Sequence, residues 1–187
     1  MPFRDWNIRP ALIGDAQAIA AVHVESSQRT YAGIYPETYL NSFSVERRER
    51  SWHDRLTAAE PASLTLVGCD DDSRVVGFIS GGRERTGKLG CDGELYAIYL
   101  LPQSQRRRLG TLLVRRFVRE LEVRRFASMA VWVLALNPSR KFYEALGGRV
   151  IAEKQIERGG DSFTEIAFGW NELSALRERL RIQAEDV

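Results

Sequence analysis

The sequence has few of the residues that build metal sites and disulfide frameworks. Its 187 residues include two cysteines, Cys69 and Cys91, and two histidines, His23 and His53. The cysteines do not form a Cys-x-x-Cys spacing and the histidines lie far apart in the chain. We therefore expect neither a structural metal nor a disulfide framework.

Long apolar runs are missing as well. No segment is long and apolar enough to span a bilayer, and residues 1–6 lack the basic flank, apolar run and cleavage site of a secretory signal. A hydrophobic content of 44% and a charged content of 28% are ordinary for a globular protein. We expect a cytoplasmic protein in which residues 1–187 form one domain, because this length suits a single core.

Lysine is also scarce, so the distribution of arginine carries most of the information about charge. The net charge of +2 is too small to indicate a nucleic-acid partner by itself. Arg106–Arg108 stand between an apolar, strand-like run and an amphipathic segment that begins at Leu109. Free N–H groups at a helix start bind anions, so this triplet predicts a phosphate or pyrophosphate site; the alternative is a solvated basic turn.

Apolar periodicity predicts alternating strands and helices. Predicted strands cover residues 8–11, 64–68, 74–79, 93–101, 130–134, 150–156 and 163–168. One predicted helix follows Asp15 and another begins at Leu109. Further predicted helices cover residues 45–56, 139–146 and the charged tail 171–187. The strands between 64 and 101 indicate an antiparallel meander, and the order from 93 to 146 indicates a parallel pair. The aromatic segment 28–40 is more typical of a lid than of a core element.

The residues around the arginine triplet resemble the pyrophosphate signature of the GCN5-related N-acetyltransferase (GNAT) superfamily. The signature is Gln or Arg, two residues, Gly, one residue, then Gly or Ala; here it falls on Gln105, Arg108 and Gly110, with arginine replacing the first glycine. The resemblance covers most of the chain and implies an α/β (α+β) fold. Its mixed, mostly antiparallel central sheet is splayed at the middle, with helices on both faces. It also implies an acetyl-CoA co-substrate, whose pyrophosphate would be held by Gln105, Arg106, Arg107, Arg108, Leu109, Gly110 and Thr111.

A second stretch, residues 137–148, resembles the family's Asn followed by Phe-Tyr-Glu-x-Leu-Gly, although its Asn-to-Tyr spacing is one residue shorter than the commonest form. The resemblance implies that Asn137 hydrogen-bonds the pantetheine arm and that Tyr143 protonates the departing thiolate. A phenol with a pKa of about 10 is a suitable donor to an alkyl thiolate. The alternative for Tyr143 is an aromatic side chain packed beside Phe142.

The strand at residues 93–102 resembles the family's central strand, whose free backbone groups pair with pantetheine. The resemblance assigns this pairing to Ile98, Tyr99 and Leu100, and it assigns to the Leu100 N–H the role of holding the oxyanion. Glu94, on the same strand, is a candidate base for the amine's proton; the alternative is a strand glutamate paired with arginine.

These features predict an N-acetyltransferase that moves acetyl from acetyl-CoA to a primary amine of a small molecule or peptide by direct attack, without metal. Neither cysteine lies in the signatures, which argues against an acetyl-enzyme. The main alternative is a non-catalytic acyl-CoA sensor or interaction module on the same fold. A nucleic-acid patch ranks last, because aromatic side chains do not cluster beside the arginines.

The sequence says less about the chemical identity of the acceptor than about the acetyl-CoA donor. Glu37, Glu94 and the nearby tyrosines favour a cationic amine, while a peptide N-terminus, a polyamine, an amino acid and an antibiotic all stay open. The tyrosines either line an acceptor pocket or cover the sheet edge; they are Tyr31, Tyr35, Tyr39, Tyr96 and Tyr99. A homodimer is a common expectation for proteins that resemble this family.

Overall fold

A seven-stranded sheet organises the chain in the order β1-β2-β3-β4-β5-β7-β6. The computed structural model describes residues 6–58 and 63–185. Its strands are β1 (Asn7–Pro10), β2 (Leu64–Cys69), β3 (Val75–Arg83), β4 (Gly93–Leu100), β5 (Met129–Leu134), β6 (Arg149–Arg158) and β7 (Asp161–Trp170). β4 and β5 are parallel, and the other neighbours are antiparallel. The predicted meander and the predicted parallel pair are both confirmed.

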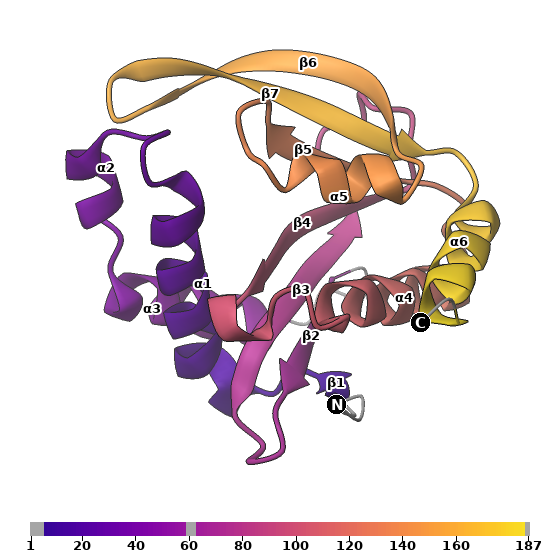
Figure 1. Cartoon of the computed structure of the whole chain (residues 1–187), viewed down its shortest axis with the longest axis horizontal. Helices are drawn as coiled ribbons and strands as arrows, with labels where there is room; N and C mark the ends of the chain where they lie inside the picture. The colour runs from indigo at the N-terminus through magenta and orange to yellow at the C-terminus, as the bar shows by residue number, and fades with distance from the viewer. Residues whose placement is uncertain (1–5, 59–62, 186–187) are drawn as a thin grey trace.

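Helices cover both faces of this sheet (Figure 1). On one face, α1 (Ala16–Tyr31) and α3 (Val45–Thr57) enclose a core with β2 and β3. On the other, α4 (Leu109–Val123), α5 (Arg140–Ala145) and α6 (Leu173–Glu185) share the larger core. The short elements are α2 (Glu37–Asn41), η1 (Ile13–Asp15) and η2 (Pro102–Ser104). The predicted layers are therefore present.

The periodicity of α4 explains how it docks on the sheet. Leu109, Leu113, Phe117 and Leu121 are fully buried, as expected for apolar residues that recur on one helical face. Arg115 and Arg119 lie on the exposed side. Docking this helix on β2, β3 and β4 places its N-terminus beside the end of β4 (Figure 1).

The sheet is splayed between β4 and β5. The pairing register joins Gly93–Leu95 to Met129–Val131 and extends no further. Beyond these residues β4 stays paired with β3 up to Leu100, and β5 stays paired with β7 up to Leu134. The two halves of the sheet therefore diverge, and within residues 6–58 and 63–185 the last part of β4 has one edge without a strand neighbour (Figure 1).

A bulge on β4 lies where the divergence begins. Ser80 of β3 pairs with Ala97, and the next residue, Gly81, pairs with Leu95. Tyr96 is consequently the extra residue on β4. A bulge bends and twists its strand, which re-aims the side chains and backbone groups that follow it.

The segment 28–40 differs from the predicted lid. α1 continues to Tyr31, and the following residues pack against the β6–β7 hairpin, where Tyr35 and Leu40 are buried with Leu134. The aromatic side chains there fill a small core because the hairpin folds over them (Figure 1).

The C-terminal part of the chain is helical. The predicted tail helix is present as α6, but residues 186–187 lie outside the described part, as do residues 1–5, on which most of the leader prediction rests. Within residues 6–58 and 63–185, none of the helices combines the length and apolarity needed to cross a membrane.

Candidate active site

The unpaired edge of β4 presents main-chain groups toward the gap in the sheet. The Leu101 N–H donates to the Val76 carbonyl, and hydrogen-bonding direction alternates along an antiparallel pair. The backbone of Tyr99 therefore bonds β3, whereas the N–H and C=O groups of Ile98 and Leu100 face away from β3. The Leu100 carbonyl accepts from Ser26 Oγ at 3.0 Å and from Gln105 Nε2 at 3.1 Å.

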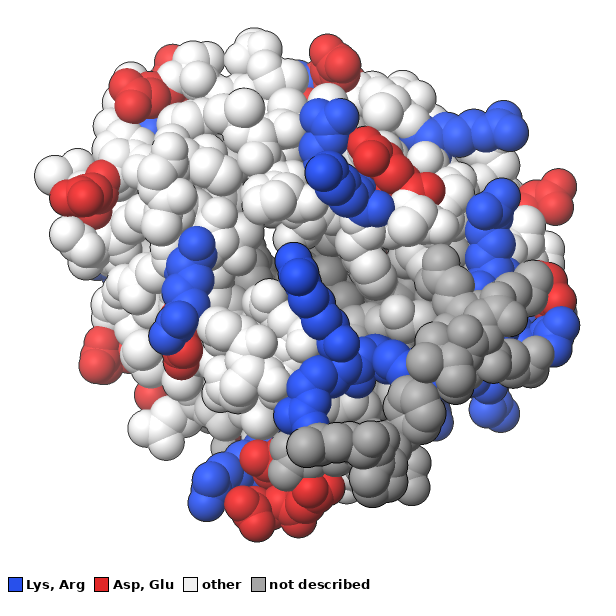
Figure 2. All heavy atoms as spheres, in the orientation of Figure 1, with Lys and Arg blue, Asp and Glu red and all other residues white. Residues whose placement is uncertain are grey.

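The arginine triplet forms a tight turn between η2 and α4. Arg106 and Arg108 both have left-handed backbone conformations, with φ of 54° and 66°. Trp6 Nε1 donates to the Arg107 carbonyl at 2.9 Å, which ties the turn to the start of β1. Figure 2 shows Lys and Arg side chains around a hollow in this face, between the positions of α1 and α5 in Figure 1.

The first turn of α4 has N–H groups available for an anion. Arg108 occupies the N-cap position without a side-chain cap bond, and the Leu112 N–H donates to the Arg108 carbonyl. The N–H groups of residues 109–111 precede that bond and have no carbonyl one turn earlier in the helix. A Cβ at Gly110 would find its nearest atoms 3.9 Å away, which explains why the signature accepts Gly or Ala there.

The second signature begins in the turn that leads into α5. Asn137 is buried, and its Oδ1 accepts from the Ser139 N–H at 2.8 Å, so the side chain shapes this turn. Tyr143 is 7% exposed and packs against Phe142, Phe168 and Trp170. Burial, with a smaller contribution from Tyr99, raises the pKa of Tyr143 above its ordinary value, so the phenol is protonated at neutral pH.

Two further tyrosines, Tyr31 and Tyr99, lie close to Tyr143. The hydroxyls of Tyr31 and Tyr99 are 3.3 Å apart. Burial and then Tyr99 raise the pKa of Tyr31, and Tyr143 contributes to the same shift. The sequence predicts that five tyrosines, as one group, line a pocket or cover the sheet edge. Two of them, Tyr35 and Tyr39, pack in the core under the β6–β7 hairpin.

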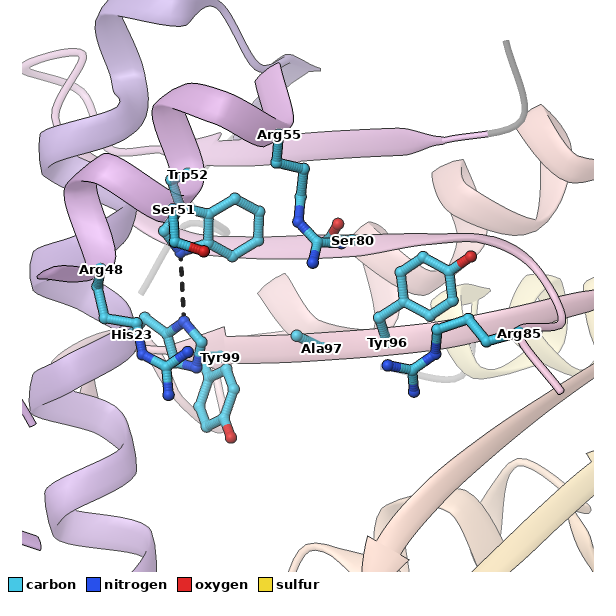
Figure 3. Close-up of a pocket in the computed structure, with 10 residues that line it drawn as sticks. All are labelled: His23, Arg48, Ser51, Trp52, Arg55, Ser80, Arg85, Tyr96, Ala97 and Tyr99. Carbon is cyan, nitrogen blue, oxygen red and sulfur yellow. Dashed lines mark hydrogen bonds between the residues drawn. The ribbon is translucent and has the colours of Figure 1, made fainter. Parts of the chain in front are cut away.

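A pocket of about 190 Å³ lies on the α1 and α3 side of β4 (Figure 3). Tyr96, Ala97 and Tyr99 contribute from β4. The remaining lining residues come from α1, α3, β3 and the loop after β3: His23, Arg48, Ser51, Trp52, Arg55, Ser80 and Arg85. Trp52 Nε1 donates to His23 Nδ1 at 3.3 Å, and the His23 ring stacks on Tyr99 with centroids 4.7 Å apart.

Glu94 is paired with an arginine of this pocket. Its side chain is 1% exposed and forms an ion pair with Arg85, whose guanidinium donates to both carboxylate oxygens. The Arg85 N–H donates to the same carboxylate at 3.1 Å. This arrangement matches the alternative of a strand glutamate bound to arginine, although here the pair is largely buried on the glutamate side.

Sequence reasoning missed most of the pocket. His23, Arg48, Arg55 and Arg85 belong to segments without a recognisable signature. Ser26 was missed for the same reason, although its hydroxyl holds the Leu100 carbonyl. The packing of α1 and α3 on the sheet and the course of the loop after β3 bring these side chains to β4, so no local pattern in the sequence signals them.

Comparisons with known proteins agree with this architecture. Residues 87–157 match the family model described as FR47-like protein. The uncharacterized N-acetyltransferase YuaI of Bacillus subtilis is 39% identical over 173 residues, which are 92% of this chain and 97% of that protein. A spermidine N(1)-acetyltransferase of Thermoplasma acidophilum is 28% identical over 109 residues, which are 57% of this chain and 65% of that protein.

Solved structures share the fold. The PaiA N-acetyltransferase of Thermoplasma acidophilum, crystallised in complex with coenzyme A, superposes with a TM-score of 0.69 at 24% identity. The alignment covers 86% of this chain and 98% of that one. With the splayed sheet, the helix-start signature and a 39% identical relative over nearly the whole chain, this protein belongs to the GNAT superfamily of N-acetyltransferases.

Proposed function

We propose that the protein transfers acetyl from acetyl-CoA to a primary amine by direct attack on the thioester. The observation that carries this proposal is the unpaired edge of β4, which ends beside the N-terminus of α4. An extended pantetheine arm would add to this edge as a strand does, while the pyrophosphate would lie at the helix start.

The donor would be held by main chain more than by side chains. Ile98 and Leu100 offer backbone groups to pantetheine, whereas Tyr99, whose backbone bonds β3, contributes its ring. The amide nitrogen of Asn137 would donate to the same arm, because its Oδ1 already caps Ser139. The N–H groups of residues 109–111, together with Gln105 and Arg106–Arg108, would surround the pyrophosphate.

The reaction would pass through a tetrahedral intermediate. The amine nitrogen bonds the carbonyl carbon, and the Leu100 N–H stabilises the oxyanion. The C–S bond then breaks, and Tyr143 gives its proton to the thiolate. The amine's proton leaves through water, which restores the phenol. Because Arg85 holds its carboxylate, we assign Glu94 a positioning role toward that arginine.

The test is Tyr143→Phe, measured by release of thiol from acetyl-CoA over an amine panel. We expect a fall in kcat of roughly a hundredfold or more, since a general acid contributes about 10²–10⁴. Calorimetry is expected to give an unchanged affinity for acetyl-CoA, because the ring stays in place.

Tyr39→Phe is the matched control, since Tyr39 packs under the β6–β7 hairpin and not at β4. Unchanged turnover of Tyr143→Phe at every pH would contradict the proton-donor role. Absence of acetyl-CoA binding up to millimolar concentration would overturn the donor assignment, and binding without turnover of any amine would favour the acyl-CoA sensor.

A further inference from the structure

The pocket beside β4 is lined by three arginines and, among the described residues, by no carboxylate. Arg48 and Arg55 lie about two turns apart on α3, and Arg85 comes from the loop after β3 (Figure 3). Trp52, also on α3, forms part of the wall. The pocket is therefore a concave site with convergent cationic groups, which is the arrangement that binds an oxyanion.

Two of these charges are not balanced by the protein. Arg85 is neutralised by Glu94. Arg48 and Arg55 instead lie over aromatic rings, Arg48 over Phe43 at 5.8 Å and Arg55 over Trp52 at 5.3 Å. Within residues 6–58 and 63–185, neither has a carboxylate at ion-pairing distance.

The histidine that lines the pocket is neutral. His23 accepts a hydrogen bond from Trp52 through Nδ1, so its ring is held against the pocket wall in a neutral form. Burial, followed by Arg48 and Arg55, lowers the pKa of His23 to about 3. The pocket thus keeps a net positive charge at neutral pH.

The pocket also lies directly beside the reacting strand. Ala97 and Tyr99 line it, and the residues that alternate with them, Ile98 and Leu100, present their backbone to the gap where the thioester is proposed to lie. The Tyr99 hydroxyl approaches that of Tyr31 at 3.3 Å, on the side toward Tyr143. A molecule anchored at the arginines would therefore have its other end at β4.

We propose that the acceptor amine belongs to a molecule that also carries a carboxylate, and that Arg48 and Arg55 bind this carboxylate. This inference rests on the proposed function and specifies its acceptor class. About 190 Å³ is smaller than a typical drug-sized site, which fits an amino acid or the end of an acidic peptide. A polyamine would place ammonium groups against unpaired guanidinium groups. The expectation of a cationic acceptor relied on Glu37, Glu94 and the nearby tyrosines, and of the two carboxylates Glu94 has its charge cancelled by Arg85.

The experiment compares L-amino acids with their amides, and spermidine serves as the polycation. Each acid and its amide share the same amine and side chain and differ in the carboxylate. The carboxylate makes the neighbouring amine more basic, so a preference for the acid cannot come from more free amine. We expect kcat/KM to be at least tenfold higher for the favoured acid than for its amide. Higher values for the amides or for spermidine would overturn the inference.

Substitutions of Arg48 and Arg55 test whether these arginines cause the preference for the acid over its amide. Arg48→Gln and Arg55→Gln are expected to lower the acid-to-amide ratio by roughly tenfold to a hundredfold, mainly through KM of the acid, while turnover of the amide is kept. Arg55→Lys, which keeps the charge, is expected to retain part of the ratio. Arg47→Gln is the control, since Arg47 lies on the same helix, is exposed and does not line the pocket.

Retained turnover of the amide shows in the same assay that a variant has folded. An unchanged acid-to-amide ratio in both glutamine variants would contradict the role of these arginines. Arg85 is left intact because its loss would strand the buried Glu94 carboxylate.

A binding measurement separates this inference from the proposed function. Calorimetric titration of the same acids and amides measures their affinity for the protein without any turnover. Preferential binding of acids that depends on Arg48 and Arg55 supports the pocket even if no acetyl transfer occurs. Acetyl transfer without any preference for acids would leave the proposed function standing and overturn the acceptor class.

Discussion

Arg108 occupies a backbone conformation that the pyrophosphate signature normally gives to glycine. Its φ of 66° lies in the left-handed region, where a side chain costs about 1 kcal/mol relative to glycine. The signature glycine thus has a conformational reason in this fold. The chain keeps an arginine there despite that cost, at the point where the proposed donor would bring its pyrophosphate.

Arg108→Gly is expected to raise the free energy of unfolding by up to about 1 kcal/mol, because glycine adopts this φ without strain. The same change is expected to weaken acetyl-CoA binding, since a cation beside the pyrophosphate is lost. Urea denaturation and calorimetry measure the two effects separately.

Arg107→Gly is the matched control for stability. Arg107 has the same side chain in the same turn, but its φ is not positive. Glycine there adds flexibility to the unfolded chain without relieving strain, so stability is expected to fall slightly or stay unchanged. Equal effects of the two substitutions would refute the strain argument.

At the scale of the element, the approach of α4 to β3 decides how the α4 N-terminus is placed. A Cβ on Gly81 would overlap the Phe117 ring and the Glu94 carbonyl. Gly81 also stands opposite the β4 bulge. Helix packing and strand irregularity therefore depend on the same small residue.

Gly81→Ala is expected to lower the free energy of unfolding by about 1–3 kcal/mol, because an overpacked methyl group must displace Phe117 or the backbone of β4. Gly14→Ala is the control, since a Cβ at Gly14 meets nothing within 4 Å. Both changes reduce the flexibility of the unfolded chain alike, so their difference reports the folded state. Similar urea midpoints for the two variants would contradict close packing at Gly81.

Apolar periodicity predicted where the helices and strands lie, but it did not predict where β3 ends or how α1 begins. β3 continues to Arg83, four residues beyond the predicted Ile79, because pairing with β4 supports glycines that weaken a strand pattern. Asp15 occupies the predicted N-cap position of α1, but its side chain makes no cap bond there; it accepts from the Leu12 N–H and pairs with Arg9 at 2.6 Å, and η1 precedes α1. These partners lie three and six residues before Asp15, so the segment that precedes α1 holds the carboxylate instead of the first turn of the helix.

At the scale of the whole molecule, the buried His23 links stability to pH. Its pKa, lowered to about 3 by burial and then by Arg48 and Arg55, compares with 6.5 in the unfolded chain. At a pH between these two values, His23 therefore binds a proton in the unfolded state and stays unprotonated in the folded state. Stability contributed by neutral His23 is complete above pH 6.5 and is lost as the pH falls toward 3.

His23→Asn is expected to flatten this dependence by up to about 1.4 kcal/mol per pH unit below pH 6, while its Oδ1 still accepts from Trp52. The measurement is the free energy of unfolding from urea titrations between pH 7 and pH 4.5. His53→Asn is the control, because His53 is exposed. A wild-type slope in His23→Asn would show that other groups cause the acid sensitivity.

Much of the fold could be predicted from the sequence, and the proposed donor side of the site rests on sequence signatures. The meander, the parallel pair and the helix start at Leu109 rest on residues close in the chain, as do the signatures at Gln105–Gly110 and Asn137–Gly148. Backbone conformation, capping and apolar periodicity are local properties, so short stretches carry them. The roles given to Tyr143, Asn137 and Leu100 stay predictions.

The tertiary structure alone decided the pocket in which we propose that the acceptor binds. Arg48 and Arg55 lie about 40 to 50 residues before the β4 residues of the pocket, and only the packing of α3 on the sheet brings them there. Glu94 and Arg85 are separated by a loop, and their ion pair changes the charge that an acceptor meets. Charge balance and burial depend on which distant groups come together. The sequence by itself determined the helix start and the signatures on which the proposed donor site rests, and folding decided which charged groups line the pocket beside β4.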